Sequence, residues 1–466
     1  MSSFVPRAVI AACASALVAC GGSSASTGPV GVRQSALSRD AAPSMADLPQ
    51  LVLDDTRFAF DLYRGLAQGN SGNLFYSPYS VSLALAMTYA GAAGQTAQQM
   101  AQALHYTLPP ARLHPAFDAL DRALASRVQD EMGQGLRLQV ADALGGDVSM
   151  TFRSAFLDTL AVDYGAGLQV ADFAGAPEPA RVAINAWVSG RTNQKIPELL
   201  PVNSIDTMTR FVLVNAIDLN APWAIPFDPK ATVSAAFTRA DGSTVKVDTM
   251  SADTSNFLGY AEGPTWQAVE IPYAGQATSM VVVLPLPGQF AAVEQGLTGD
   301  FVNCLQPSPE LNLQVTLPKF TVHGPVIDLT VQLQALGMVD AFADSADFSA
   351  MTAQAVKLKA VFHDLRASRR ERNGSRCFHG GHRHSDERPV AIEDGEREPA
   401  ILLLRAGLAD ERRALRQQGH GSDHAELRRR ELLRRREDLW RLRVVLQPSL
   451  RSPSRCVSPA LQIDPL

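Results

Sequence analysis

The chain has 466 residues, of which 46% are hydrophobic, and its formal net charge is -5. This composition excludes a mainly disordered or fibrous chain and provides enough apolar material for one large or two ordinary globular domains. The charge is distributed unevenly, because arginine is crowded after His363 and no lysine follows Lys359. The segment after His363 therefore differs in composition from the rest of the chain.

The N-terminus has the pattern of a bacterial export signal. Arg7 precedes a short apolar run at residues 8–19, which is too short to span a bilayer as a helix. The letters L-V-A-C at residues 17–20, followed by glycine, resemble a lipobox. We predict a lipoprotein signal peptide over residues 1–19 and a lipid-modified Cys20; an ordinary cleaved signal is the alternative.

Residues 20–50 are rich in Ser, Ala, Gly and Pro, and we predict a disordered tether that does not pack. The protein is then expected outside the inner membrane, lipid-anchored to the cell envelope or extracellular. Of five cysteines, Cys13 leaves with the signal and Cys20 carries lipid, while Cys304 has no obvious partner. No disulfide framework is implied.

The central part of the chain alternates helical and strand patterns. Helical spacing of apolar residues predicts helices over residues 51–67, 96–104, 109–127 and 177–196. Alternation or dense apolar runs predict strands over residues 136–145, 211–216, 245–250, 268–272, 280–285 and 311–322. The run at 211–216 is apolar throughout, as in a strand that is buried on both faces.

One further helix start carries the most specific pattern of the chain. Ser77 can cap the first turn, Pro78 suits the first helical position, and apolar periodicity follows. The whole stretch 73–96 reads N-L-F-Y-S-P-Y-S-V-S-L-A-L-A-M-T-Y-A-G-A-A-G-Q-T and resembles the signature of the serpin family, N-x-h-h-S-P-x-S-h-x-x-A-L-x-M-x-x-x-G-A-x-x-x-T.

Weaker family-like motifs follow in the family's order. They are I-N-A-W-V at 184–188, L-V-N-A at 213–216, Trp223 with Pro226 and Phe227, V-T-L-P-K-F at 315–320, L-G-M-V-D-A-F at 336–342 and V-F-H at 361–363. The resemblance covers residues 51–363, which we take as an incomplete serpin domain. It implies an α+β fold with three β-sheets surrounded by about eight to nine helices.

The resemblance also implies a function and a set of site residues. Serpins are serine protease inhibitors in which a cleaved reactive loop inserts into a central sheet. The residues that resemble the family's gate under that sheet are Asn73, Ser77, Pro78, Ser80, Asn215 and His363, and those that resemble the upper part of the sheet are Trp223 and Lys319. For each of these, simple packing is the alternative role.

After His363 the family pattern stops, and an Arg-rich tail fills residues 364–466. Cys377, His379, His382 and His384 could be taken for a metal cluster, and residues 428–443 for a basic helix that binds nucleic acid. Neither has convincing ligand spacing or aromatic interleaving. We therefore predict no metal, no cofactor and no nucleic acid, and give the sequon at Asn373, Gly374 and Ser375 no weight.

A frameshift explains the tail better. In the frame that starts at the second base of each codon, residues 372–380 permit Gly-Thr-Glu-Ala-Ala-Ala-Ser-Thr-Ala, which resembles the family's hinge. Residues 398–405 permit Asn-Arg-Pro-Phe-Phe-Phe-Phe-Val, and residues 419–422 permit Val-Thr-Asp-Pro, both similar to the family's last segments. We infer that an out-of-frame, disordered tail replaces the reactive loop and the C-terminal strands, leaving strand edges unpaired.

The chain is thus interpreted as a serpin-type inhibitor, inactive as written, with serine proteases as partners and a monomeric state. A non-inhibitory or inactivated serpin-like surface protein is the alternative. We expect no enzyme, because G-x-S-x-G, H-E-x-x-H, phosphate-loop and dinucleotide motifs are missing.

Overall fold

The structure, a computed structural model, describes residues 31–367 with internal gaps, together with residues 401–406 and 443–448. The gaps are residues 41, 69, 71–72, 126–136, 221, 239–242, 256–258, 275–277, 287, 299–305, 308–311, 321 and 324–325. The predicted signal peptide, Cys20 and the cysteine, histidine and sequon residues of the tail lie outside the described residues.

Helix α2 (Pro78–Tyr89) begins as the sequence predicts. The Ser77 hydroxyl accepts a hydrogen bond from the Ser80 N–H at 3.3 Å, and Pro78 occupies the first helical position. Nearly the whole helix is buried, so its apolar residues point in every direction. Within the described residues, no helix is both long and apolar enough to span a membrane.

Seven other α-helices are described. They are α1 (Leu48–Ala67), α3 (Gly94–Ala103), α4 (Pro110–Ala125), α5 (Ser154–Tyr164), α6 (Pro177–Arg191), α7 (Phe290–Gln295) and α9 (Thr330–Ala335), with 3-10 turns at Pro229–Ala231 and Asp340–Phe342. The predicted helices α1, α3, α4 and α6 are confirmed. The sequence patterns missed α5, α7 and α9, of which the latter two have only six residues each.

The central sheet, sheet A, has the strand order β1-β4-β3-β5-β15-β13, with β14 also paired to β15. Its strands are β1 (Gly31–Arg33), β3 (Arg137–Asp147), β4 (Leu168–Ala171), β5 (Phe211–Asn220), β13 (Val322–His323), β14 (Ile327–Asp328) and β15 (Val361–Ala367). Strands β5 and β15 are parallel neighbours, although they lie far apart in the sequence.

Two further sheets complete the fold. Sheet B has the order β11-β8-β9-β10-β16-β17-β2, and the third sheet has the order β12-β7-β6. Their strands are β2 (Leu74–Tyr76), β6 (Val233–Thr238), β7 (Thr244–Ser255), β8 (Gly259–Glu262), β9 (Trp266–Pro272), β10 (Thr278–Pro285), β11 (Gln306–Pro307), β12 (Asn312–Pro318), β16 (Ile401–Ala406) and β17 (Arg443–Pro448). Three sheets and eight described α-helices confirm the predicted fold class.

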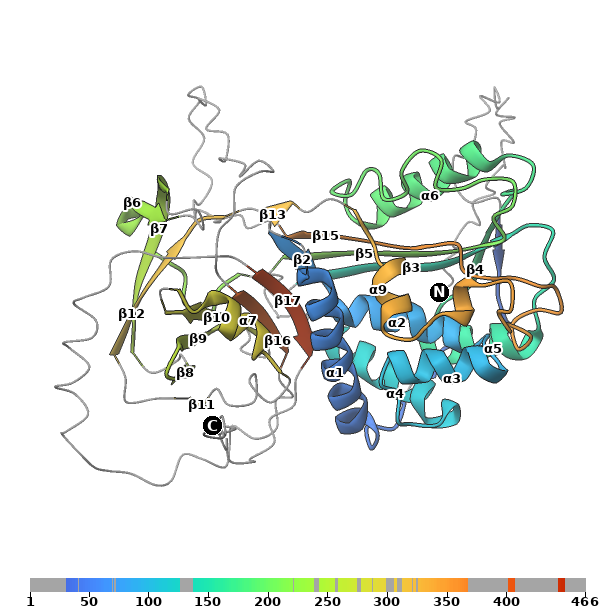
Figure 1. The fold of residues 1–466 in the computed structure, drawn as a ribbon, viewed down its shortest axis with the longest axis horizontal. Coiled ribbons are helices and arrows are strands. Elements are labelled where there is room, and N and C mark those ends of the chain that lie inside the picture. The colour runs from blue at the N-terminus through green and yellow to red at the C-terminus, as the bar shows by residue number, and fades with distance from the viewer. Residues whose placement is uncertain are drawn as a thin grey trace, which may run out of the picture.

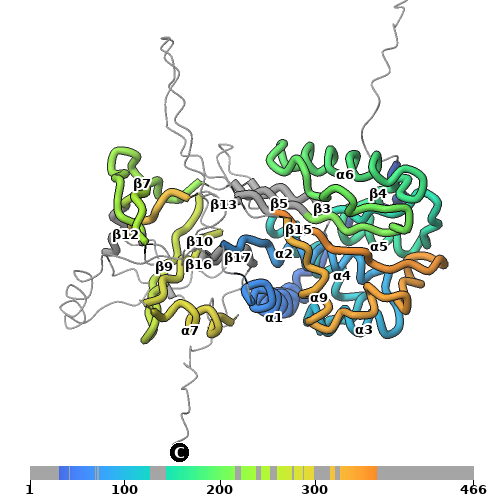
Figure 2. Tube along the Cα trace, turned by 45° about the horizontal axis from the view of Figure 1, so that its top comes forward, coloured from blue at the N-terminus to red at the C-terminus, as the bar shows by residue number. Residues whose placement is uncertain are grey.

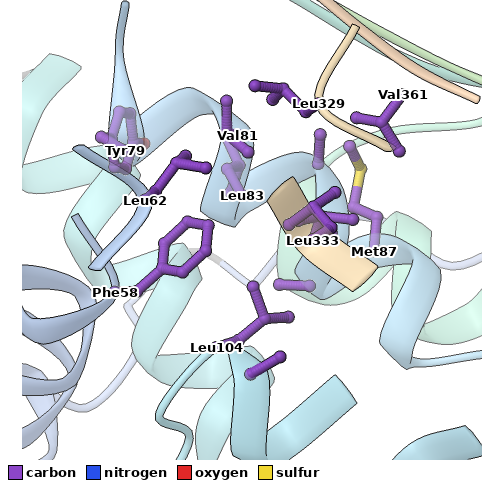
Figure 3. Packing of buried hydrophobic residues seen from close by; sticks show 14 of the residues in the cluster. Phe58, Leu62, Tyr79, Val81, Leu83, Met87, Leu104, Leu329, Leu333 and Val361 are labelled. Carbon is purple, nitrogen blue, oxygen red and sulfur yellow. The ribbon is translucent and has the colours of Figure 1, made fainter. Parts of the chain in front are cut away.

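Sheet A is covered on both faces (Figure 1). Helix α6 lies over one face, and α2 and α9 lie beneath the other; the tilted view in Figure 2 shows the same layers. Strand β5 contributes to both sides, because Phe211 and Leu213 join the large core while Val212 and Val214 join the cluster under α6. Figure 3 shows the large core, where Val81 and Met87 of α2 lie near Leu329, Leu333 and Val361.

The tail contains strands, which corrects the prediction of a wholly disordered segment after His363. Strand β15 continues to Ala367, β16 pairs antiparallel with β10, and β17 pairs parallel with both β16 and β2. The edge of β10 is therefore paired, contrary to expectation. The apolar run I-L-L-L at residues 401–404 has the composition of a strand whatever its origin.

The prediction of a disordered tether is also partly wrong. Residues 31–40 and 42–47 have a described structure, and the first of these segments contacts the domain. Strand β1 pairs antiparallel with β4 at the outer edge of sheet A. Arg39 forms ion pairs with Asp118 and Asp121 of α4. Side-chain contacts to distant helices, which composition alone does not reveal, hold this segment in place.

Candidate functional site

The candidate site lies on the seam between β5 and β15, the two parallel strands at the centre of sheet A. Backbone pairing sets Asn215 of β5 directly opposite His363 of β15. Both residues are fully buried, with 0% of each exposed. The residues before them are apolar and form the two-sided core, so the polar groups meet here at the end of an apolar stretch of the sheet.

The N-terminus of α2 supplies the rest of the site from beneath the sheet. Strand β2 leads into Ser77, and the cap and Pro78 then turn the chain into the helix. Ser77 and Ser80 are both fully buried. The local signals that begin the helix therefore also bring two hydroxyls, and an amide N–H that has no partner within the helix, under the seam.

A continuous hydrogen-bond network joins the three elements, and we call it the gate network: Ser77, Ser80, Asn215 and His363. The Ser80 hydroxyl donates to Asn215 Oδ1 at 2.7 Å, and the Ser77 N–H donates to His363 Nε2 at 3.0 Å. The other ring nitrogen, Nδ1, also contacts Asn215 Oδ1. The network thus ties the start of α2 to both strands of the seam.

These partners define the protonation state of His363. Because Nε2 accepts from an N–H, Nδ1 must carry the proton and donate to Asn215 Oδ1, so the ring is neutral. Burial lowers the pKa of His363 to about 3. A second proton would also point at the Ser77 amide, at the positive end of a helix. The gate network is therefore built for a neutral imidazole.

The other predicted gate residues have different settings. Pro78 contributes only backbone geometry, as the first residue of α2. Asn73 directly precedes β2, and its Oδ1 is buried without a hydrogen-bond partner among the described residues. The structure thus brings together Ser77, Ser80, Asn215 and His363, and it does not bring the Asn73 oxygen into their network.

Trp223 and Lys319 lie on separate elements. The Trp223 ring stacks on Tyr273 with centroids 4.8 Å apart and an interplanar angle of 5°, and Phe227 packs edge-on at 5.8 Å. Lys319 follows β12, and its N–H donates to the Asp248 carbonyl of β7 at 2.7 Å. The sequence offered no signal for the role of Tyr273 as the stacking partner of Trp223, because about fifty residues separate them.

The site can hold hydrogen bonds rather than a metal ion. No group of three or more His, Cys, Asp or Glu residues that could hold a metal occurs within the described ranges. The four network residues are one imidazole, one amide and two hydroxyls, all engaged with each other or with backbone. This arrangement can stabilise two neighbouring strands and would have to rearrange if another strand entered between them.

Comparison with known proteins gives a consistent result. A family model described as Serpin (serine protease inhibitor) matches residues 54–372. A curated relative, leukocyte elastase inhibitor from Bos taurus, is 37% identical over 314 residues, which cover 66% of this chain and 81% of the relative. Serpin B6 from Pongo abelii is 35% identical over 313 residues, which cover 66% and 82%.

Solved structures show the same fold. Serpin-12 from Manduca sexta, described as a serine protease inhibitor, matches with a TM-score of 0.63 and 25% identity over 69% of this chain and 88% of that one. Uncleaved ovalbumin matches with a TM-score of 0.62 and 24% identity over 68% and 88%. At this identity the ovalbumin match shows the fold alone.

The comparisons also correct the expectation about enzymes. The expectation of no enzyme rested only on the absence of catalytic motifs from the sequence. The family description replaces it with a positive role, because a serine protease inhibitor is defined by the protease that it engages.

Proposed function

The chain belongs to the serpin family, and from this membership we propose that it derives from an inhibitor that is consumed in the act of blocking a serine protease. In such an inhibitor the protease cleaves an exposed loop, and the loop then enters the central sheet. We further propose that the chain as written has lost this activity, because its loop lies out of frame after His363.

One observation carries the proposal: the seam between β5 and β15 is a junction of parallel strands held by the gate network. A strand that enters there from the end of β15 would run antiparallel to both neighbours. Antiparallel pairing is slightly more stable per residue than parallel pairing, and one parallel ladder would be replaced by two antiparallel ladders. The seam is thus able to gain hydrogen bonds by opening.

The proposed reaction balances without a cofactor. The hydroxyl oxygen of the protease serine attacks the carbonyl carbon of the scissile bond, the C–N bond breaks, and the new amine end of the loop takes the proton. The protease remains joined to the loop as an acyl ester. Insertion of the loop into sheet A then carries the protease away before water can hydrolyse the ester. In this proposal the inhibitor is a monomer, and its partners are serine proteases.

The frameshift is supported by the position of the break. The family-like motifs end at His363, the family model matches only to residue 372, and the neighbouring frame permits a hinge-like sequence at residues 372–380. We propose no nucleic-acid role for the Arg-rich residues, because their composition follows from the shifted frame. Resequencing of the locus tests this, and an intact gene without the hinge-coding bases would refute it.

We also propose that the protein is exported and anchored through lipid on Cys20. Replacing Cys20→Ser should remove the acyl group, so the protein moves from the membrane fraction to the soluble fraction of a bacterial host. Mass spectrometry of the mature N-terminus measures the same change. Cys13→Ser is the matched control, because Cys13 lies in the leader, and it should leave fractionation unchanged. Soluble wild-type protein would contradict the anchor.

A further inference from the structure

Residues 31–40, which we call the strap, extend sheet A on the side away from the seam. In β1, Gly31 pairs with Val170 and Arg33 pairs with Leu168 of β4. Strand β4 is parallel to β3, and β3 is antiparallel to β5. The strap is therefore connected through a continuous ladder to the strand that forms one side of the seam.

The strap packs closely against two glycines, Gly165 and Gly167. A Cβ atom at Gly167 would lie 2.6 Å from Val32 Cγ1 and 3.4 Å from the Arg33 carbonyl oxygen. A Cβ atom at Gly165, which has a φ of +59°, would lie 2.6 Å from Arg39 Cδ. A side chain at either glycine of the turn between α5 and β4 would therefore have to displace side chains of the strap, and at Gly165 it would also have to adopt a positive φ.

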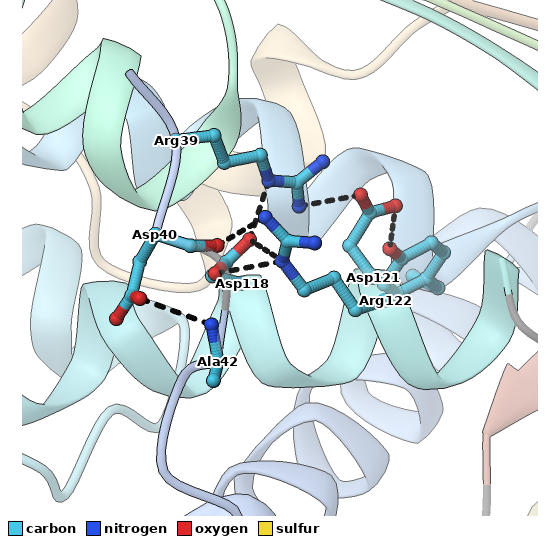
Figure 4. Close-up of polar contacts among 7 residues, drawn as sticks. Arg39, Asp40, Ala42, Asp118, Asp121 and Arg122 are labelled. Carbon is cyan, nitrogen blue, oxygen red and sulfur yellow. Dashed lines mark hydrogen bonds and ion pairs between the residues drawn. The ribbon is translucent and has the colours of Figure 1, made fainter. Parts of the chain in front are cut away.

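The far end of the strap is held by charge (Figure 4). Arg39 Nε donates to Asp118 Oδ1 at 2.5 Å, and Nη2 donates to Asp121 Oδ2 at 2.7 Å. Arg122 of α4 donates in return to the Asp40 carbonyl. Arg39 thus bridges two carboxylates, and because the Asp118 side chain is fully buried, its contact is partly desolvated rather than a loose surface pair.

The strap also contacts α5. Its Arg39 guanidinium lies among several carboxylates. The Ser35 hydroxyl donates to Asp158 Oδ1 at 2.5 Å, and the Asp40 N–H donates to the Val162 carbonyl at 3.0 Å. Burial, followed by the charges of Asp118 and Asp40, raises the pKa of Asp163 to about 6. Arg39 pairs with two carboxylates of this acidic group, Asp118 and Asp121, and so offsets part of the repulsion between them.

We propose that the strap is a clamp that fastens β4 and β3 to helices α4 and α5 and thereby slows the opening of sheet A at the seam. The proposal rests on the proposed function in one respect, namely that the seam opens. Helix α4 belongs to the large core through Phe117 and Leu120, so it is a fixed point. Movement of β4 away from it would break the contacts of Arg39 and Ser35.

Hydrogen exchange on the full 466-residue chain tests the clamp. Arg39→Ala should speed amide exchange in β4 and β3 by about tenfold, the factor expected for loss of hydrogen bonds to a charged group. Gly167→Ala should produce the same regional effect by displacing the strap sterically. The matched control is Arg33→Ala, because Arg33 is an exposed arginine on the same strap. Amide exchange in β4 and β3 of this variant should match that of wild type. Unchanged exchange in both Arg39→Ala and Gly167→Ala would overturn the clamp.

A second measurement separates the clamp from the proposed function. The probe is a synthetic peptide, Gly-Thr-Glu-Ala-Ala-Ala-Ser-Thr-Ala, added to the intact chain, with incorporation followed by native gel. Arg39→Ala should incorporate it faster than wild type, and equal rates would overturn the slowing effect. Incorporation into neither chain would refute opening of the seam, and hence the proposed function, while hydrogen exchange would still decide whether the strap fastens β4.

Discussion

Restoring the reading frame should convert the chain from an inert protein into one that forms an SDS-resistant complex with a serine protease. Deletion of one base directly after the His363 codon moves translation into the frame that starts at the second base of each codon. The product then carries the hinge-like sequence that this frame permits, a few residues beyond β15, where it can enter between β15 and β5. The covalent acyl bond explains why the complex survives denaturation.

The measurement is a gel of the purified product after incubation with a panel of serine proteases of different specificity. The matched control deletes the whole Asp364 codon, which shortens the chain but keeps the written tail, and it should give no complex. A frame-restored chain that is folded yet is cleaved by every protease without a complex would contradict inhibition by loop insertion. Complex formation by the written chain would contradict its proposed inactivity.

The substitution His363→Ala should lower the free energy of unfolding at pH 7, and this loss relative to wild type should shrink as the pH falls. At neutral pH the variant leaves the buried Ser77 N–H without its acceptor, and the expected loss is roughly 3 kcal/mol when the small cavity is included. His363 in the unfolded chain binds a proton near its ordinary pKa of 6.5, whereas the folded chain holds its pKa at about 3.

Because the folded pKa is lowered, the contribution of His363 is fully present above pH 6.5 and is lost as the pH falls towards 3. The pKa difference of 6.5 minus about 3 corresponds to a change on the order of 5 kcal/mol. Urea unfolding at pH 7, 5.5 and 4.5 should show the wild-type and variant free energies of unfolding converging. His105→Ala, at a partly exposed histidine outside the gate network, should change the free energy by less than about 1 kcal/mol. A constant gap across this range would show that His363 is not held neutral.

Local rules predicted the parts of the molecule that depend on local chemistry. Ser77 and Pro78 begin α2 because a hydroxyl and a proline suit a helix start in any fold. The apolar run at 211–216 predicted a strand that is buried on both faces, and β5 has that environment where its burial is described. The pairing of Asn215 with His363 is different in kind, because register between distant strands has no local signal; only the family resemblance placed the two residues together.

The strap and the tail strands show where sequence reasoning failed. Residues around Arg39 have the composition of a linker, and its partners Asp118 and Asp121 lie some eighty residues further along the chain, so no spacing could reveal the ion pairs. In the tail, the inference of a shifted frame implied disorder, but pairing depends only on whether a segment can form a strand. Residues 401–406 have that ability, and β10 offers an edge that no other described strand occupies.

The parallel pairing of β5 with β15 also dictates the order of events during synthesis. Leu213 can pair with Val361 only after about 150 further residues have been synthesised, which at ordinary elongation rates takes roughly 7 to 30 s. During that interval the edge of β5 has no partner from its own chain on that side, so it is a site for chaperone binding or for aggregation. Sheet A becomes complete only when Ala367 has been added, and a ribosome that stops before β15 would release a chain whose central sheet cannot close.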